Sequence, residues 1–331
     1  MTLKTKPISK IGVFTSGGDA PGMNAAIRAV VRAGTYYDKE VFGIYRGYEG
    51  MIDGEIVKLG VRSVGNILQR GGTILKTARS ENFRTKEGRL IAYENLKKHG
   101  IDALVAIGGD GTFTGIHKFF HEFGVPAVCI PGTIDNDIAG TDYTIGYDTA
   151  TNTAVEAIDR IRDTALSHNR LFFIEVMGRH SGYIAINSAI AGGAVTAIIP
   201  EVDMTFDELY TLLEQSGKAN KRSSLIVVAE GSKIGGASEL ARLVAQRSSY
   251  FDTKVTILGH LQRGGAPTYF DRVLASRMGV ASVEGLLNGE TDAMVGVFKN
   301  KMVYNQFDDI MQGQIHPIDA ETLKLAKILS I

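Results

Sequence analysis

Pro131-Gly132-Thr133-Ile134-Asp135-Asn136-Asp137 follows the apolar run 125–130. An apolar strand that ends in Pro-Gly places the next residues at the carboxyl edge of a sheet, where open α/β folds bind their ligands. Asp135 and Asp137 are two residues apart, so in an extended segment both carboxylates face the same side. Acidic turn residues are also common because Asp and Asn hydrogen-bond their own backbone. The heptad alone therefore leaves a catalytic pair and an ordinary turn equally open.

A glycine-rich loop lies a short way upstream. Gly108-Gly109-Asp110-Gly111-Thr112 follows the apolar run 103–107 and precedes a helical pattern over 113–123. Bare N–H groups at a helix N-terminus bind phosphate. An Asp among them would repel a polyphosphate unless a divalent cation lies between the two, so Asp110 is a candidate Mg²⁺ ligand. A glycine turn with a capping Asp is the alternative.

The remainder of the chain alternates between apolar runs and helical patterns. Strands are expected at 11–15, 41–45, 103–107, 125–130, 171–176, 197–199, 225–229, 255–258 and 294–303, the last with a turn at 299–301. Helices are expected at 23–33, 90–99, 113–123, 149–166, 183–190, 206–213, 237–245 and 269–287. The segment 52–59, with Asp53-Gly54, predicts a hairpin, and 79–88 a polar loop. Apolar strands separated by helices indicate an α/β fold with parallel sheets covered on both faces.

Bulk properties exclude several classes of protein. A chain of 331 residues should form about two domains. The 36 basic and 36 acidic side chains cancel, which favours neither nucleic acid nor an anionic membrane as a partner. The single cysteine, Cys129, excludes an internal disulfide and sits in an apolar strand as a buried thiol. Residues 1–10 lack a signal-peptide core, and we expect a cytoplasmic protein without membrane spans.

Further glycine loops follow other expected strands. Ser16-Gly17-Gly18-Asp19-Ala20-Pro21-Gly22 is neither a Walker A sequence nor a dinucleotide motif. Met177-Gly178-Arg179-His180 and Gly259-His260-Leu261-Gln262-Arg263-Gly264-Gly265 carry a cation beside glycine, and Glu230-Gly231 a carboxylate. A guanidinium fork matches two phosphate oxygens, so these loops suit phosphate recognition, although a single exposed Arg is usually just solvated.

Five motifs in this order resemble bacterial ATP-dependent 6-phosphofructokinases over essentially the whole chain. They are residues 15–24, 108–112, 131–137 with Gly140-Thr141-Asp142, Glu175-Val176-Met177-Gly178-Arg179, and 259–265. The Gly-Gly-Asp-Gly element alone would be unspecific, because lipid kinases and NAD kinases carry a similar one.

The resemblance implies a fold, a domain division and a reaction. The fold would be two Rossmann-like three-layer domains with mainly parallel sheets and the active site in the cleft between them. Residues 1–146 plus 263–312 would bind ATP, and 147–262 plus 313–331 would bind fructose 6-phosphate. The enzyme would transfer the γ-phosphoryl of ATP to the 1-hydroxyl of D-fructose 6-phosphate, giving fructose 1,6-bisphosphate and ADP, the committed step of glycolysis.

The resemblance also implies roles for single residues. Asp135 would be the general base, Thr133, Arg179 and Gly17 would act on the transferring phosphoryl, and Asp110 would bind Mg²⁺ with Asp137 as a further candidate. The positions that match nucleotide contacts are Gly17, Tyr48, Arg79, Arg84, Gly109, Asp110, Gly111, Thr112 and Gly115. Those that match sugar phosphate contacts are Thr133, Asp135, Asp137, Arg170, Met177, Gly178, Arg179, Glu230, Lys254, His260 and Arg263. Arg170 and Lys254 would come from a neighbouring subunit, which implies a homotetramer.

Two glycines bear on the phosphoryl donor. Pyrophosphate-dependent relatives carry Asp at the position of Gly111 and Lys at that of Gly132, so the small residues here favour ATP. A pyrophosphate-dependent enzyme stays an alternative, as does a nucleotide-sensing subunit that does no chemistry. The second would require loss of the base or the metal ligand, and both Asp135 and Asp110 are present. An NAD or diacylglycerol kinase would leave residues 177–179 and 259–265 without a role.

The chain departs from the family at several positions. Lys254 stands where many relatives have Arg, which exchanges a fork for a point charge and weakens sugar phosphate binding, and Ser80 stands where an aromatic often lies near the adenine. The family's effector cleft binds ADP or a phosphoenolpyruvate-type anion, and its basic positions here are Arg28, Arg32, Arg162, Lys221 and Arg222. Well-regulated relatives carry charges at the positions of Val61, Asn66, Val195 and Ala219. We therefore expect weakened or rewired allosteric regulation.

Overall fold

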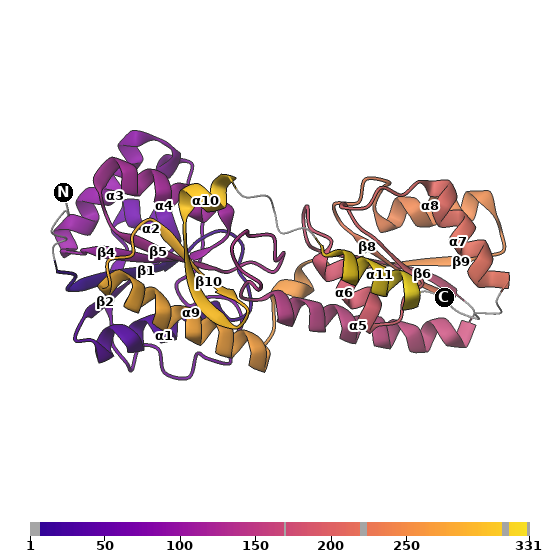
Figure 1. Ribbon diagram of the computed structural model, residues 1–331, viewed down its shortest axis with the longest axis horizontal. Helices are drawn as coiled ribbons and strands as arrows, with labels where there is room; N and C mark the ends of the chain where they lie inside the picture. The colour runs from indigo at the N-terminus through magenta and orange to yellow at the C-terminus, as the bar shows by residue number, and fades with distance from the viewer. Residues whose placement is uncertain (1–6, 169, 219–223, 313–317, 330–331) are drawn as a thin grey trace. The chain divides into compact units, whose positions relative to one another are not determined.

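The chain divides into two compact units. The structure, a computed structural model, describes residues 7–168, 170–218, 224–312 and 318–329 (Figure 1). Unit 1 comprises Met1–Thr133, Ile138–Gly146 and Arg263–Ile315, and unit 2 comprises Ile134–Asp137, Tyr147–Gln262 and His316–Ile331. Residues 134–137 of the central heptad therefore group with unit 2. Which ligand each unit binds stays a prediction, as does an active site between them.

Unit 1 is built on a sheet of seven strands within the described residues, in the order β11-β10-β5-β4-β1-β2-β3. The strands are β1 (Lys10–Thr15), β2 (Glu40–Ile44), β3 (Ile56–Leu59), β4 (Ala103–Gly108), β5 (Ala127–Pro131), β10 (Ala293–Phe298) and β11 (Lys301–Gln306). The inner strands run parallel, whereas β3 and β11 pair antiparallel at the two edges. From β1 the sheet extends through β2 on one side and β4 on the other. This reversal is a topological switch point, where α/β sheets bind ligands.

Helices cover both faces of the unit 1 sheet. In Figure 1, α1 (Met23–Tyr36) and α9 (Tyr269–Leu287) lie on one face, and α2 (Gly47–Asp53), α3 (Lys86–His99) and α4 (Asp110–Phe123) on the other. A Cβ at Gly279 of α9 would lie 2.6 Å from Ala29 Cβ, so α1 and α9 pack backbone to backbone. On the second face Phe14, Phe113 and Phe119 form the core, which α10 (Phe307–Gln312) joins through Phe307.

Unit 2 holds a parallel sheet of four strands among its described residues, ordered β7-β8-β6-β9. They are β6 (Arg170–Val176), β7 (Thr196–Ile198), β8 (Ser224–Ala229) and β9 (Asp252–Ile257). Leucines of α7 (Phe206–Lys218) and α8 (Ala237–Arg247) pack on one face of this sheet. On the other face lie α5 (Tyr147–His168), α6 (Tyr183–Ala191) and α11 (Ala320–Leu329) (Figure 1).

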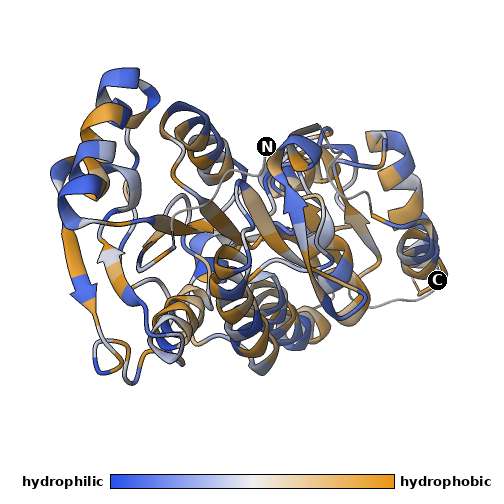
Figure 2. Cartoon of the chain, turned by 60° about the vertical axis from the view of Figure 1, so that its left-hand side comes forward, coloured by the Kyte–Doolittle hydropathy of each residue, from blue (hydrophilic) through white to orange (hydrophobic). Residues whose placement is uncertain are grey.

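The expected α/β class with mainly parallel sheets is confirmed. Figure 2 shows hydrophobic and hydrophilic residues alternating along the helices, as expected for helices that cover a sheet on one side only. Strand β9 is a correction, because it lies at the edge of its sheet and is partly exposed rather than buried. Among the described residues, every helix is too short or too polar to cross a bilayer.

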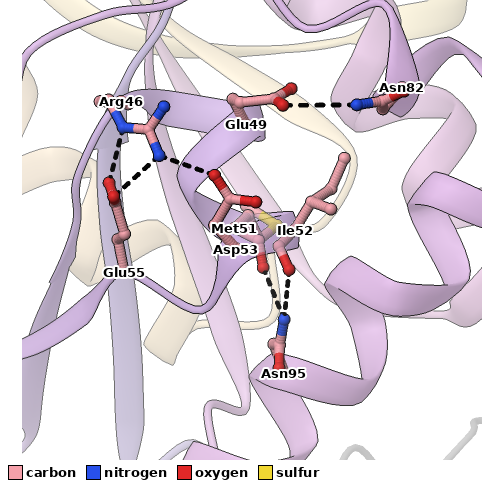
Figure 3. Close-up of polar contacts among 8 residues, drawn as sticks. All are labelled: Arg46, Glu49, Met51, Ile52, Asp53, Glu55, Asn82 and Asn95. Atoms are coloured by element: carbon pink, nitrogen blue, oxygen red, sulfur yellow. Dashed lines mark hydrogen bonds and ion pairs between the residues drawn. The ribbon is translucent and has the colours of Figure 1, made fainter.

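The expected hairpin over 52–59 is wrong. Residues 47–53 form α2, and Gly54 ends this helix in the left-handed region (φ 74°), while β3 pairs with β2 instead. Figure 3 shows what holds α2: Asn95 Nδ2 of α3 donates to the carbonyl oxygens of Met51 (3.2 Å) and Ile52 (2.7 Å). Arg46, just before the helix, donates to Asp53 (2.7 Å) and Glu55 (2.8 Å). Asp53-Gly54 is therefore a helix end and not a hairpin turn.

Two helices begin earlier than expected. The polar segment 79–88 contains the short 3₁₀ helix η1 (Asn82–Arg84) and the first turn of α3, which starts at Lys86 after the N-cap Thr85. Thr85 Oγ1 accepts a hydrogen bond from Gly88 N at 3.0 Å. Helix α4 begins at Asp110 rather than 113, so the glycine loop forms its first turn.

Candidate active site

Three loops meet at the switch point of unit 1. Ser16 N, directly after β1, donates to Ile107 O of β4 at 3.0 Å. Gly132 N, directly after β5, donates to Gly108 O at 2.9 Å. The glycine loop 16–22, the glycine loop 108–112 and the start of the heptad therefore lie side by side at one sheet edge, as their positions after parallel strands predict.

The glycines of these loops do two different things. A Cβ at Gly108 would lie 2.4 Å from Thr112 Oγ1 and 2.5 Å from Ser16 O, so Gly108 permits the close approach of the two loops. A Cβ at Gly109 or Gly111 would meet nothing within 4 Å. These two positions therefore form bare backbone open to a ligand, at the N-terminus of α4, where a helix attracts anions.

Asp110 is the first residue of α4 and is exposed. The alternative of a capping Asp is not what the structure has, because the N-cap position is Gly109 and no side chain caps the helix there. The Asp110 carboxylate instead accepts a hydrogen bond from Gly111 N at 2.9 Å. It places a hard oxygen ligand among bare N–H groups, so the residues present fit a divalent cation bridged to phosphate.

Tyr48 supports the glycine loop from behind. Its side chain is buried, its hydroxyl donates to the backbone oxygen of Thr112, and its ring stacks on Phe83 at 4.0 Å. A Cβ at Gly115 would lie 2.7 Å from the Tyr48 hydroxyl, which explains the glycine. Burial raises the pKa of Tyr48 well above its ordinary value, so the hydroxyl stays a donor. Tyr48 thus packs against the first turns of α4 and holds the backbone of Thr112 in place.

The expected nucleotide contacts Arg79 and Arg84 are exposed in the segment around η1. Arg89 of α3 anchors this segment: its Nη1 donates to the carbonyl oxygens of Phe83 (2.9 Å) and Arg84 (2.8 Å). Arg89 also donates to both carboxylate oxygens of Glu122 on α4, at 2.6 and 2.7 Å. This ion pair lowers the pKa of Glu122 and raises that of Arg89. A buried cation therefore ties the Arg84 segment to α4.

The Arg263 side chain packs against the first glycine loop, residues 16–22. Its Nη1 donates to Asp19 O at 3.2 Å, and a Cβ at Gly18 would lie 2.4 Å from the same nitrogen. Unit 1 therefore brings this expected sugar phosphate residue against residues 18–19. His260, in the 3₁₀ helix η2 (Gly259–Arg263), is exposed.

The heptad does not run extended. Asn136 has a left-handed backbone (φ 52°), so the extended segment in which Asp135 and Asp137 would face one side is not formed. Asp135 is 7% exposed, and Asp137 is less buried. Thr133 O accepts a hydrogen bond from Thr144 Oγ1 at 2.7 Å.

Unit 2 gathers residues 177–179 and Glu230 at the carboxyl ends of β6 and β8. One oxygen of Glu230 accepts from Arg179 N (2.7 Å) and Gly178 N (3.3 Å), in a turn with positive φ at both residues. Gln262, to which sequence analysis gave no role, is fully buried and accepts from Met177 N at 2.8 Å. Its place between the expected ligands His260 and Arg263 was the available signal.

Asp252 holds the two cations that were expected to reach a neighbouring subunit. Arg170 Nε donates to Asp252 Oδ2 at 3.0 Å, and Lys254 Nζ donates to Oδ1 at 2.6 Å. Arg170 and Asp252 are register partners on β6 and β9. The pKa of Asp252 is lowered by these two bonds. Two positive charges are thus fixed together on the neighbouring strands β6 and β9, an arrangement suited to a phosphate.

The basic positions of the expected effector cleft divide between the units. Arg28 and Arg32 lie one turn apart on α1, where burial and the charge of Arg32 lower the pKa of Arg28. Arg162 lies on α5 of unit 2. Lys221 and Arg222, like Ala219, lie outside the described residues. Arg28 and Arg32 are therefore neighbours within unit 1.

A scan against protein-family models matches residues 10–286 to the phosphofructokinase model. The chain belongs to the phosphofructokinase family. Among its relatives, the ATP-dependent 6-phosphofructokinase of Cytophaga hutchinsonii is 55% identical over 98% of each chain. ATP-dependent 6-phosphofructokinase 1 of Thermus thermophilus is 54% identical over 98% of this chain and 100% of that one. The resemblance of the five motifs is thereby confirmed.

Solved structures give the same fold. Phosphofructokinase of Saccharomyces cerevisiae matches with a TM-score of 0.88 at 39% identity, over 92% of this chain and 45% of the yeast chain. A pyrophosphate-dependent phosphofructokinase of Marinobacter aquaeolei matches with a TM-score of 0.84 at 20% identity, which supports the fold alone. The glycine loops described above therefore belong to a chain with the phosphofructokinase fold.

Proposed function

We propose that this protein is an ATP-dependent 6-phosphofructokinase, which transfers the γ-phosphoryl group of ATP to the 1-hydroxyl of fructose 6-phosphate. One observation supports this most directly: a bare-backbone surface at Gly109 and Gly111 surrounds the exposed carboxylate of Asp110 at a helix N-terminus. Such a surface suits a polyphosphate with its cation. Relatives more than 50% identical over nearly the whole chain are named for this activity.

Asp110 is the proposed ligand of Mg²⁺. When bound, this ion would neutralise phosphate charge, which is the main demand of phosphoryl transfer. The chain's own residues would then hold and align the tail of the nucleotide. The backbone N–H groups of the loop 108–112 would bind phosphate oxygens, and Tyr48 would keep that loop in place through Thr112 O.

Asp135 is the proposed general base, which accepts the proton of the sugar 1-hydroxyl as that oxygen attacks. Thr133, Arg179 and Gly17 would stabilise the transferring phosphoryl. The turn 177–179 presents the Arg179 side chain from a backbone fixed by Glu230 and Gln262. Pre-organisation of this kind lets the charge of a transition state be met without rearrangement.

The sugar phosphate would be held by Met177, Gly178, Glu230, His260 and Arg263, and by Arg170 and Lys254 of a neighbouring subunit. The Asp252 bridge supports the last part, because it presets the spacing of Arg170 and Lys254. A shared site of this kind requires an oligomer, and we propose a homotetramer in the cytoplasm. Sedimentation measurements with and without fructose 6-phosphate would check the assembly.

We propose ATP rather than pyrophosphate as the donor. The space at Gly111 is open, so an Asp there would fit the protein. It would occupy the volume that the nucleotide needs and add a negative charge beside its phosphates. We also propose that regulation by ADP or a phosphoenolpyruvate-type anion is weakened or rewired, because the side chains at four effector positions are uncharged: Val61, Asn66, Val195 and Ala219. A sigmoidal fructose 6-phosphate curve that ADP straightens fully would contradict the weakened regulation.

Substitution of the base tests the mechanism. We expect Asp135→Asn to lower kcat by at least about a hundredfold, the lower range for a positioned base, with little change in either KM. The matched control is Asp203→Asn, because Asp203 is an exposed carboxylate paired with Lys233 at 2.6 Å and should leave kcat unchanged. Near-normal turnover in Asp135→Asn would overturn the assignment.

A further inference from the structure

Helix α4 carries a second cluster of chemistry-bearing side chains, which the phosphoryl transfer does not use. His117 and His121 are four residues apart, so they share one face of the helix. Asp292, immediately before β10, and Asp308, in the first turn of α10, lie against this face. All four belong to unit 1. Along the helix axis His117 is about 10 Å from Asp110, at 1.5 Å per residue, so the two groups are separate.

The distances in this cluster are those of a metal site. One ligand atom each from His117, His121 and Asp292 can be chosen so that all three lie within 4.8 Å of one another. Ligand atoms about 2.0–2.1 Å from a tetrahedral Zn²⁺ stand about 3.3 Å apart. His121 Nε2 lies 3.5 Å from Asp292 Oδ2, close to that spacing. His117 Nδ1 lies 2.8 Å from the same oxygen, a hydrogen bond whose proton a metal would replace.

Asp292 supplies an independent observation. The residue is 8% exposed, and its other oxygen, Oδ1, is buried with no hydrogen-bond partner among the described residues. Its backbone oxygen accepts from Phe307 N at 3.1 Å, so its position is fixed from the start of α10. A buried acceptor without a partner is unfavourable. The His117–Asp292 hydrogen bond accounts for Oδ2 and leaves Oδ1 unpaired, whereas a cation bound by both carboxylate oxygens would satisfy both.

The ligand set indicates the kind of ion. Two imidazoles and a carboxylate suit Zn²⁺ and similar transition metals, whereas Mg²⁺ and Ca²⁺ prefer oxygen ligands alone. We propose that His117, His121 and Asp292 form a binding site for a divalent transition metal of the Zn²⁺ class. Asp308 lies outside this ligand set: its Oδ1 is 3.7 Å from His117 Nε2, the ring nitrogen that points away from a metal bound at Nδ1, so it would orient the ring as an outer partner. The ion would fasten the later turns of α4 to the start of β10.

The experiment measures metal binding directly. The full-length protein is stripped with a chelator, freed of the chelator, and titrated by calorimetry with Zn²⁺, and with Co²⁺ followed by its visible absorption. We expect one Zn²⁺ per chain at this site, the absorption of tetrahedral Co²⁺, and a melting temperature that rises with Zn²⁺. His121→Asn should weaken binding at least about tenfold; since its side chain is 58% exposed, the variant should fold.

The control is His99→Asn, which removes a histidine of α3 whose Nδ1 contacts Asn95 O and not the cluster. This variant should bind Zn²⁺ as the wild type does. His117→Gln should abolish the Co²⁺ absorption. No binding to the wild type, or equal Zn²⁺ affinity in wild type and His121→Asn, would overturn the proposal. Because the readout is binding without ATP or sugar, its failure would leave the proposed kinase activity untouched.

Discussion

Removal of the Arg89 side chain should weaken unit 1 and the nucleotide site together. Arg89→Ala deletes two bonds to Glu122 and two to the carbonyls of Phe83 and Arg84. Breaking a buried ion pair costs about 3–5 kcal/mol. The Glu122 side chain is 27% exposed, so water can reach its carboxylate and the lower end, about 3 kcal/mol, applies. In a domain of this size that lowers the melting temperature by about 6–12 °C.

The same change should act on ATP more than on the sugar. Without Arg89, the segment that carries Arg84 loses the two hydrogen bonds that position it. We expect this to weaken ATP binding by about 1 kcal/mol, the net contribution of one hydrogen bond. This corresponds to about a fivefold rise in the KM for ATP. Glu122→Gln retains Arg89 and its two carbonyl bonds, so it should lose stability with less than about a twofold change in that KM.

Calorimetry and steady-state kinetics with each substrate varied measure both effects. The control is Arg160→Ala, which removes an exposed ion pair with Glu156 on α5 and should cost less than about 0.5 kcal/mol. A melting temperature for Arg89→Ala within about 2 °C of wild type would refute the stability argument, because a loss of about 3 kcal/mol should lower it by at least about 6 °C. An equal rise in the KM for both substrates would refute the anchoring role.

Three further predictions concern charge and space. The pKa of Glu122 is lowered in the folded protein. Its stabilisation is therefore fully present above the unfolded value of about 4.3 and is lost as the pH falls through the lower, folded value. The free energies of unfolding of wild type and Glu122→Gln should converge as the pH falls below the unfolded value. Gly111→Asp should fold normally and lose ATP-dependent activity, because a side chain at position 111 meets no protein atoms. Gly108→Ala should lower the melting temperature, because a Cβ at position 108 meets Thr112 and Ser16. Normal ATP use by Gly111→Asp would contradict the donor argument. Asp252→Asn keeps one of the two acceptor oxygens and removes a charge that, at roughly 6 Å, opposes a bound phosphate by about 0.7 kcal/mol per unit charge. The KM for fructose 6-phosphate should then fall about threefold, and a rise would show that both carboxylate oxygens are needed to position the cations.

Local rules account for the parts of the fold that the sequence predicts. The strand, glycine loop and helix units at β1–α1 and β4–α4 appear where expected because apolar runs, glycines and helical periodicity are all short-range signals. The hairpin over 52–59 failed on an ambiguous signal: Asp-Gly can form a hairpin turn, but Gly at positive φ also ends helices. Asn95, more than 40 residues away, decides between them by holding the carbonyls of α2.

The candidate site also contains residues that short-range patterns predict and residues whose roles depend on distant partners. Asp110 and its glycines were predictable because loop chemistry lies within five consecutive residues. The roles of Gln262 and Asp252 depend on partners on other strands and loops, which no pattern along the chain displays. The sequence left open whether the heptad is extended. The structure has a bend at Asn136, and Asn tolerates the left-handed region well.

The division of unit 1 among separate stretches has a consequence during translation. Strand β5 gains its outer neighbour β10, and α1 gains the close partner α9, only from residues beyond 262. The ribosome therefore synthesises almost all of unit 2 before the strands that complete the sheet of unit 1. A nascent chain that stalls in between would expose the apolar flank of β5 and the alanines of α1, and would become a substrate for chaperones rather than an enzyme.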